Sequence, residues 1–70
     1  MNNLPSKLTN NIKVLRTMLN LTQEELAIKT LCTRQTINAI EKNKYSPSLL
    51  LAYKIAYILE TNIDQVFGKE

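Results

Sequence analysis

The 70-residue sequence contains no histidine, a single glycine and a single cysteine. Without histidine, the chain lacks the commonest general acid-base group and a principal zinc ligand. One glycine, Gly68, cannot form the glycine-rich loops that bind phosphate or a dinucleotide. The six acidic residues are scattered along the chain rather than paired. We therefore expect that the protein is not an enzyme and that it uses no cofactor and no metal.

Other features that the sequence lacks indicate the cellular compartment. Cys32 is alone, so it cannot form an intramolecular disulfide, which fits a reducing interior. The N-terminal residues contain no apolar segment of signal-peptide length, and no run of roughly 18 apolar residues could span a membrane. We expect a cytoplasmic protein without a membrane partner.

The composition that remains is that of one small globular domain. Hydrophobic residues make up 44% of the chain, and the formal net charge is +3 with a pI near 9.2. This charge gives a mild preference for anionic partners. We expect a flexible tail at residues 1–7 and one domain at residues 8–70, with no second domain for a small-molecule effector.

Hydrophobic periodicity and capping residues predict five short helices. In the first, Ile12, Leu15 and Leu19 have helical spacing, and Asn20 lies where a left-handed C-terminal cap is expected. The fold class that follows is all-α, a compact five-helix domain.

The second and third helices are predicted from their first residues. Thr22 and Glu25 form a capping box at the start of a helix that extends to about residue 30. Thr33 caps a third helix that continues to Lys42. Two short helices joined by a tight turn indicate a helix-turn-helix motif, although periodicity alone also allows another small helical bundle.

The last two helices have similar signals. Ser46 can cap the fourth helix, with Pro47 in its first turn, and the helix continues to about residue 60. Asn62 and Gln65 form a capping box for a short fifth helix.

The third helix has an unusual outer face. On a helical wheel, Ile37 and Ile40 point to the core, and the opposite face carries Gln35, Asn38, Ala39 and Lys42, with Arg34 at its edge. Arginine suits guanine O6 and N7, while glutamine and asparagine suit adenine N6 and N7. The alternative is an ordinary solvated face, but such a face normally carries glutamate and lysine pairs. An outer face without acids favours nucleic-acid recognition.

Residues around this helix could contact the DNA backbone. Thr33 and Thr36 can reach phosphate oxygens or a thymine methyl group. The segment that follows supplies further polar groups for phosphate: Lys42, Asn43, Lys44 and Tyr45.

The motifs "LTQEELA" and "RQTINAIE", followed by the exit "NKY", resemble the Cro/CI-type helix-turn-helix family, also called lambda-repressor-like or XRE. The resemblance covers roughly residues 10–67. It implies that the third helix lies in the major groove of double-stranded DNA and that the protein binds palindromic operators as a homodimer.

The resemblance also assigns roles to single residues. It implies that Gln23 contacts phosphate and supports the third helix. It places Thr33, Arg34, Gln35 and Asn38 at bases or nearby phosphates, and Asn43, Lys44 and Tyr45 at the DNA backbone. It also implies a structural ion pair between Arg16 and Glu41 inside the fold.

Three positions depart from the family pattern, and a fourth invites another interpretation. Leu31 stands where the family has glycine, so it either adopts a positive φ or reshapes the turn. Thr30 replaces an apolar residue, and Ile28 replaces a polar one. Cys32 could sense oxidants, but a small core residue is the simpler interpretation.

The fourth helix is apolar on two sides. One side suffices for the core: Leu49, Ala52, Ile55, Ala56 and Leu59. A nearly opposite strip contains Leu50, Tyr53 and Tyr57, and Val66 and Phe67 add apolar area near the chain end. Because two apolar sides imply burial on both, we predict a homodimer whose interface contains these five residues.

The leading hypothesis is a sequence-specific DNA-binding transcriptional regulator, most simply a repressor that occludes a palindromic operator. The alternative is a protein-interaction module of the same fold, such as an antitoxin or antirepressor.

Overall fold

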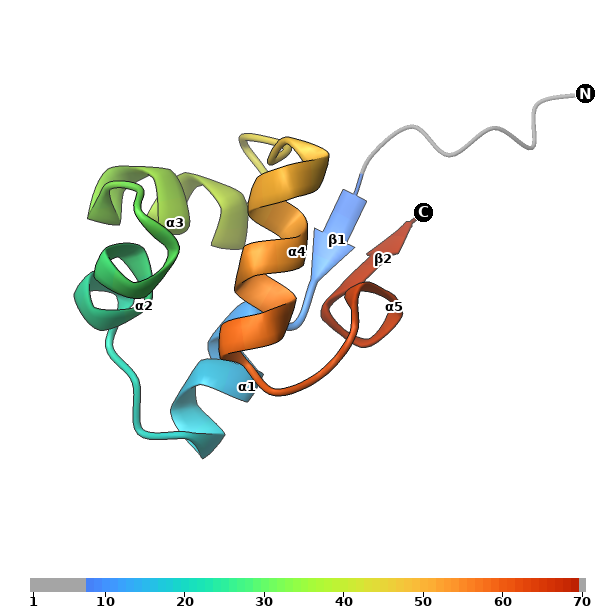
Figure 1. The fold of residues 1–70 in the computed structure, drawn as a ribbon. Helices are drawn as coiled ribbons and strands as arrows, with labels where there is room; N and C mark the ends of the chain where they lie inside the picture. The colour runs from blue at the N-terminus through green and yellow to red at the C-terminus, as the bar shows by residue number, and fades with distance from the viewer. Residues whose placement is uncertain (1–7, 70) are drawn as a thin grey trace, which may run out of the picture.

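Five helices and two short strands make up residues 8–69, the part of the chain that the computed structural model describes (Figure 1). In chain order they are β1 (Leu8–Asn10), α1 (Ile12–Met18), α2 (Gln23–Thr30), α3 (Arg34–Glu41), α4 (Leu49–Ile58), α5 (Ile63–Val66) and β2 (Phe67–Lys69). The predicted five-helix fold is confirmed, with a small sheet added. The tail expected at 1–7 lies outside the described residues. Among residues 8–69, no helix is both long and apolar enough to cross a membrane.

Helix α4 lies at the centre of the fold. Figure 1 shows α2 and α3 on one side of it, and α5 with the two strands on the other. The buried apolar side chains come from all five helices and their ends: Ile12, Leu26, Ala27, Ile37, Ile40, Ala52, Ile55, Ala56, Leu59, Val66 and Phe67. Removing these side chains from water is the main term that favours folding.

The predicted N-terminal caps of α2 and α3 are confirmed. Thr22 Oγ1 accepts the Glu25 N–H at 3.0 Å, and the Glu25 carboxylate accepts the Thr22 N–H at 2.8 Å. The bond from the Thr22 backbone lowers the pKa of Glu25 below its ordinary value of 4.5. This cap therefore stabilises α2 above that pH and is lost as the pH falls through the lowered pKa. At α3, Thr33 Oγ1 accepts the Thr36 N–H at 3.1 Å.

Helix α4 begins later than predicted. Its N-cap is Ser48 rather than Ser46, and Ser48 Oγ accepts the Leu51 N–H at 3.1 Å. Leu49, expected in the core, lies in the first turn and is 69% exposed. Leu50 in the same turn is exposed too, while Leu51 packs against the core. The other predicted core residues of α4 are buried.

The first four helices all end in a residue with left-handed backbone, and none of these residues is glycine. They are Asn20, Leu31, Asn43 and Glu60, with φ of 59°, 61°, 59° and 62°. After each, the next N–H donates to the carbonyl five residues back, at 2.9–3.0 Å. This arrangement satisfies carbonyls that a helix end otherwise leaves unpaired.

The turn between α2 and α3 keeps a left-handed residue although it lacks the expected glycine. Leu31 has φ 61° and ψ 43°, so it adopts the positive φ and the turn is not reshaped. The buried Thr30 hydroxyl donates to the Leu26 carbonyl at 2.8 Å, which makes a polar residue tolerable there. Cys32 is partly buried and packs against the core, consistent with its structural interpretation. Ile28 is exposed, as expected of an isolated apolar residue.

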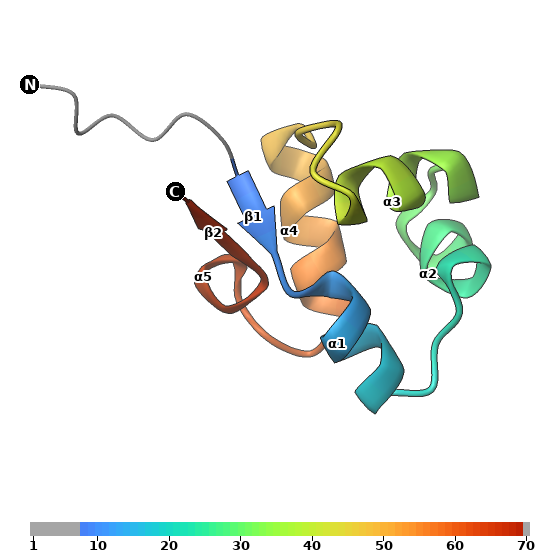
Figure 2. The same ribbon diagram turned by 180° about the vertical axis from the view of Figure 1, so that it is seen from behind.

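The two strands form an antiparallel sheet that the sequence analysis did not predict. Leu8 pairs with Lys69 and Asn10 with Phe67, and Figure 2 shows the strands side by side. Val66 is completely buried and Phe67 is 9% exposed, and both belong to the hydrophobic core. The prediction that these two residues lie at a dimer interface is therefore wrong, because the chain's own core covers them.

The predicted ion pair between α1 and the end of α3 is confirmed. Arg16 Nε donates to Glu41 Oε2 at 2.8 Å and Nη2 donates to Oε1 at 3.2 Å. The two side chains are 12% and 8% exposed. Arg16 Nη1 also donates to the Leu21 carbonyl at 2.9 Å. This bidentate pair is among the stronger polar contacts that side chains can form.

The strain at Leu31 can be measured with two variants. Leu31→Gly and Leu31→Ala both remove the exposed side chain, but only glycine lacks the Cβ that disfavours left-handed backbone. We expect Leu31→Gly to have a free energy of unfolding about 1 kcal/mol higher than Leu31→Ala. Urea denaturation followed by circular dichroism measures the difference, and equal stabilities would show that this turn is not strained.

The ion pair makes a second prediction. Arg16→Met or Glu41→Leu alone should lower the free energy of unfolding by about 3–5 kcal/mol, because each strands the other charge in a mostly buried position. The double variant should lose clearly less than the sum of the two single losses. Additive losses in denaturation experiments would contradict this account of the pair.

Candidate nucleic-acid interface

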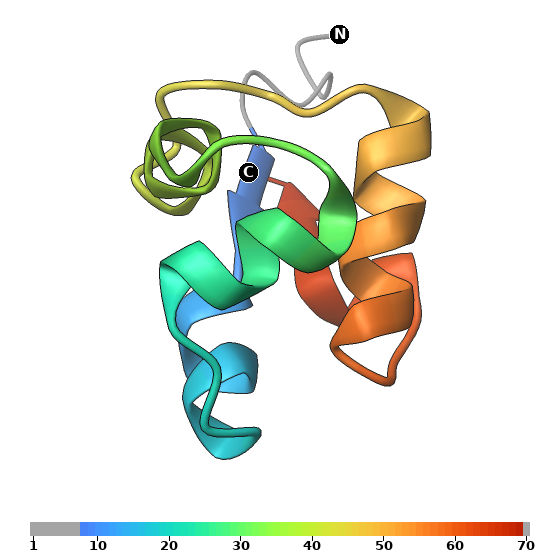
Figure 3. The same ribbon diagram turned by 60° about the vertical axis from the view of Figure 1, so that its left-hand side comes forward.

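Helix α3 lies at the edge of the molecule and is supported from behind by α2. Figure 3 brings α2 to the front and shows α3, in yellow-green, nearly end-on beside it. Ile37 and Ile40 are buried and hold α3 on the core. The opposite face of α3 is left free, as the helical wheel predicted.

The outer face of α3 is polar and carries no acid. Arg34 and Gln35 are exposed, and Thr36 and Asn38 are partly exposed. Glu41, the only acidic residue of α3, turns inward to Arg16. A face with this chemistry can offer hydrogen bonds to base edges without repelling phosphate.

The segment after α3 extends this face. Lys42, Asn43, Lys44 and Tyr45 are all exposed. A shallow hollow of about 230 Å³ brings Tyr45 beside α3, and its lining is Thr33, Gln35, Thr36, Ala39 and Tyr45. Residues from the cap, the helix and the exit therefore share one surface, as the sequence analysis expected.

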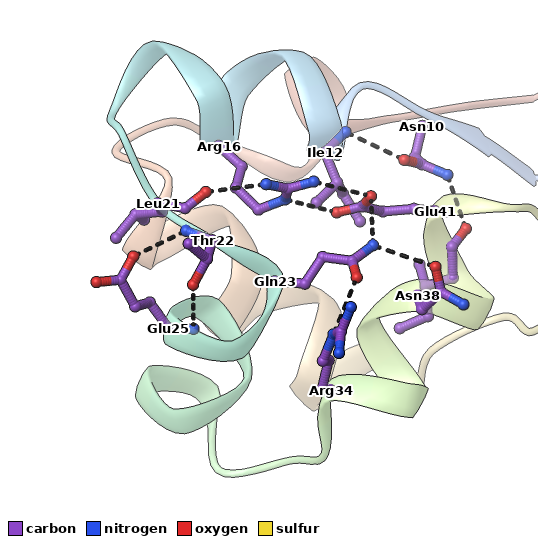
Figure 4. A network of polar contacts seen from close by, with 11 residues as sticks. Asn10, Ile12, Arg16, Leu21, Thr22, Gln23, Glu25, Arg34, Asn38 and Glu41 are labelled. Carbon is purple, nitrogen blue, oxygen red and sulfur yellow. Dashed lines mark hydrogen bonds and ion pairs between the residues drawn. The ribbon is translucent and has the colours of Figure 1, made fainter.

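Gln23 connects this surface to the buried ion pair (Figure 4). Its Nε2 donates to Glu41 Oε1 at 3.1 Å and to Asn38 Oδ1 at 3.2 Å. Its Oε1 accepts a longer bond, of 3.5 Å, from Arg34 Nε. The role in supporting the third helix that the resemblance implied for Gln23 therefore has a physical basis in these three bonds.

Asn10 is a positioning residue that the sequence analysis did not identify. Its Nδ2 donates to the Ile40 carbonyl at 2.8 Å and to Asn43 Oδ1 at 2.9 Å, and its Oδ1 accepts the Ile12 N–H at 3.1 Å. These bonds hold the end of α3 against the start of α1. No sequence signal indicated the two bonds to the end of α3, since Ile40 and Asn43 lie 30 and 33 positions away.

A second notable surface lies on α4, away from the α3 face. Leu50, Tyr53 and Tyr57 are 64%, 59% and 81% exposed, so the predicted apolar strip is uncovered in the single chain. Beside it is an apolar hollow of about 590 Å³, with a lining that includes Lys29, Leu31, Tyr53, Tyr57, Ile58 and Ile63. Nothing among residues 8–69 gathers three or more metal-ligating acidic, cysteine or histidine side chains.

Comparison with known proteins identifies the family. The helix-turn-helix family model matches residues 12–66. An HTH-type transcriptional regulator of Methanocaldococcus jannaschii is 53% identical over 58 residues, which are 83% of this chain and 88% of the relative. The regulator YgzD of Bacillus subtilis is 44% identical over 61 residues, covering 87% of this chain and 92% of the relative. Both relatives are named as uncharacterised.

Solved structures agree with this match. A protein of Bacteroides fragilis superposes with a TM-score of 0.78 at 30% identity, covering 87% of this chain and 98% of that one. The restriction-modification controller protein C.AhdI of Aeromonas hydrophila gives 0.72 at 28% identity, covering 77% and 78%. With its helix-turn-helix geometry and its match over most of the chain, the protein belongs to the XRE-type helix-turn-helix family of DNA-binding transcriptional regulators.

Proposed function

We propose that the protein is a repressor that binds a palindromic DNA operator as a homodimer, with α3 in the major groove. The observation that carries the proposal is the acid-free outer face of α3, fixed from behind by Gln23 and the buried ion pair. A rigid element with few accessible rotamers loses little entropy when it binds.

The residues divide into two groups by their position. Arg34, Gln35 and Asn38 face base edges, with Thr33 and Thr36 at bases or nearby phosphates. Gln23 and the exit residues contact phosphates and set the register of α3 in the groove: Lys42, Asn43, Lys44 and Tyr45. Repression by occlusion requires only that the operator be occupied.

The exposed strip of α4 supports the dimer. Leu50, Tyr53 and Tyr57 lie together on the exposed side of α4, where an isolated domain would carry polar residues. A second copy related by a two-fold axis would cover them and present two α3 helices to half-sites about 34 Å apart.

The alternative function, a protein-interaction module such as an antitoxin or antirepressor, also has an observation in its favour. The apolar hollow beside Tyr57 and Leu31 is large enough to accept side chains of another protein. The dependence on salt separates the two functions. Binding to DNA weakens steeply as salt rises, because neutralised phosphates release counterions, whereas binding through apolar surface does not.

Substitutions in α3 and in the segment after it should have different effects on DNA binding. Arg34→Ala and Gln35→Ala should each relax base preference and cost about 1–3 kcal/mol of specific binding, whereas Lys44→Ala should weaken all sequences evenly and reduce the salt slope by about 1. Binding is measured against an operator selected from random DNA, with circular dichroism as the control for folding. If Arg34→Ala and Gln35→Ala both leave affinity and preference unchanged, the assignment of α3 is wrong.

The dimer is tested by its mass in solution. We expect Tyr57→Glu to convert the dimer to monomers, because it places a charge in the apolar strip, and to weaken operator binding although no base-reading residue has changed. Val14→Glu is the matched control, because Val14 is 60% exposed on α1, outside the strip, and should leave the dimer intact. Sedimentation at micromolar concentration that finds a monomeric wild-type protein would refute the dimer.

A further inference from the structure

The hydrogen bonds between α1, α2 and α3 have a fixed direction. The Arg16 guanidinium can only donate hydrogen bonds, and an ionised carboxylate can only accept them. Glu41 accepts two bonds from Arg16 and a third, at its Oε1, from Gln23. The atom of Gln23 that faces Glu41 must therefore be the amide nitrogen Nε2.

The orientation of the Asn38 amide is fixed in the same way. The second hydrogen on Gln23 Nε2 points to the Asn38 amide, at 3.2 Å. The facing atom of Asn38 must be its acceptor, Oδ1. Figure 4 shows the result, with the Asn38 nitrogen on the far side of its amide from Gln23.

Rotating either amide by half a turn would break hydrogen bonds. A reversed Gln23 would place its oxygen against the Glu41 carboxylate, and a reversed Asn38 would place two donors in contact. The Glu41 side chain is only 8% exposed, so water cannot readily replace the bond that a reversed Gln23 would lose there, and the Gln23–Asn38 contact is itself partly buried. The buried ion pair thus determines which atom of Asn38 is available on the outer face of α3.

We infer that Asn38 acts on DNA as a hydrogen-bond donor, through Nδ2, and that it favours a base with a keto group at its position, guanine or thymine. The inference rests on the proposed function of α3. The usual two-bond contact between asparagine and adenine also needs the amide oxygen, which here is bonded to Gln23. Gln35, which has no side-chain bond among the described residues, keeps both amide groups for a base. Gln23 is the positioning residue for this preference.

An Asn38 that only donates should respond to base substitution in a distinctive way. A transition exchanges a keto group for an amino group at the same place in the major groove. An Asn38 that only donates should therefore discriminate against the transition at the base pair it contacts. One hydrogen bond of this kind corresponds to roughly 3- to 10-fold in affinity.

The experiment starts from the operator that the wild-type protein selects from random DNA. Affinity is then measured for every transition in that operator, with the wild-type protein and with Asn38→Ala, Gln23→Met and Gln65→Met. The base pair that Asn38 contacts is the one at which Asn38→Ala loses discrimination. Gln23→Met keeps the length of the side chain but releases the Asn38 amide, so discrimination at that same pair should fall toward 1-fold. Gln65→Met is the matched control, because Gln65 is exposed on α5, away from the α3 surface, and it should leave every pair unchanged.

Asn38→Asp provides a test that does not disturb Gln23. One carboxylate oxygen can still accept the bond from Gln23, and the other faces the DNA as an acceptor. The preference at that base pair should reverse toward the amino base, with weaker binding overall because the added charge repels phosphate. If circular dichroism shows that Gln23→Met does not fold, Asn38→Asp still tests whether the Asn38 amide nitrogen contacts the base.

Three results would overturn the inference while leaving the proposed function intact. In the first, Gln23→Met discriminates as the wild-type protein does. In the second, the pair that Asn38 contacts favours adenine or cytosine, which means that the amide oxygen reads the base. In the third, Asn38→Ala leaves the discrimination at every base pair unchanged. A wild-type protein that enriches no sequence from random DNA would instead overturn the proposed function, and the inference with it.

Discussion

The ion pair between Arg16 and Glu41 is the contact on which the rest of the helix-turn-helix arrangement depends. Two charges that are almost out of water are tolerable only when they are paired and fully hydrogen-bonded. Here the pair joins the first helix to the last residue of α3, and the spare bonds of each partner reach the chain between them, at Leu21 and Gln23. The position of α3 on the core is thus determined by an electrostatic requirement as well as by Ile37 and Ile40.

The chain has almost no glycine, and its helices end without one. Four helices end in left-handed residues that carry a side chain. Two of these residues are asparagine, which tolerates this conformation, whereas the other two, Leu31 and Glu60, do not favour it. The fold therefore accepts local backbone strain at two helix ends. In exchange, an unfolded chain with a single glycine has less conformational freedom to lose.

Features encoded by neighbouring residues could be predicted from the sequence, and features that depend on distant ones could not. The capping box at Thr22, the cap at Thr33 and the inward side of α3 each follow from a few adjacent positions. The start of α4 was misplaced because Ser46 and Ser48 both suit an N-cap. Strands of three residues have no periodicity to detect, so the sheet was missed, and Val66 and Phe67 were assigned to the surface although they belong to the core. The orientation of the Asn38 amide required the positions of three helices.

The sheet also has a consequence for how the domain can be handled and altered. It pairs residues 8–10 with residues 67–69, and the Asn11 N–H donates to the Val66 carbonyl at 2.8 Å, so the two ends of the domain are fastened to each other. Figures 1 and 2 both show them on the side opposite to α2 and α3. A protein fused at either end would therefore emerge away from the α3 surface, and trimming one end would release the other. The two strands enclose nearly the whole domain in one loop, so they are expected to open together and early when the protein unfolds locally.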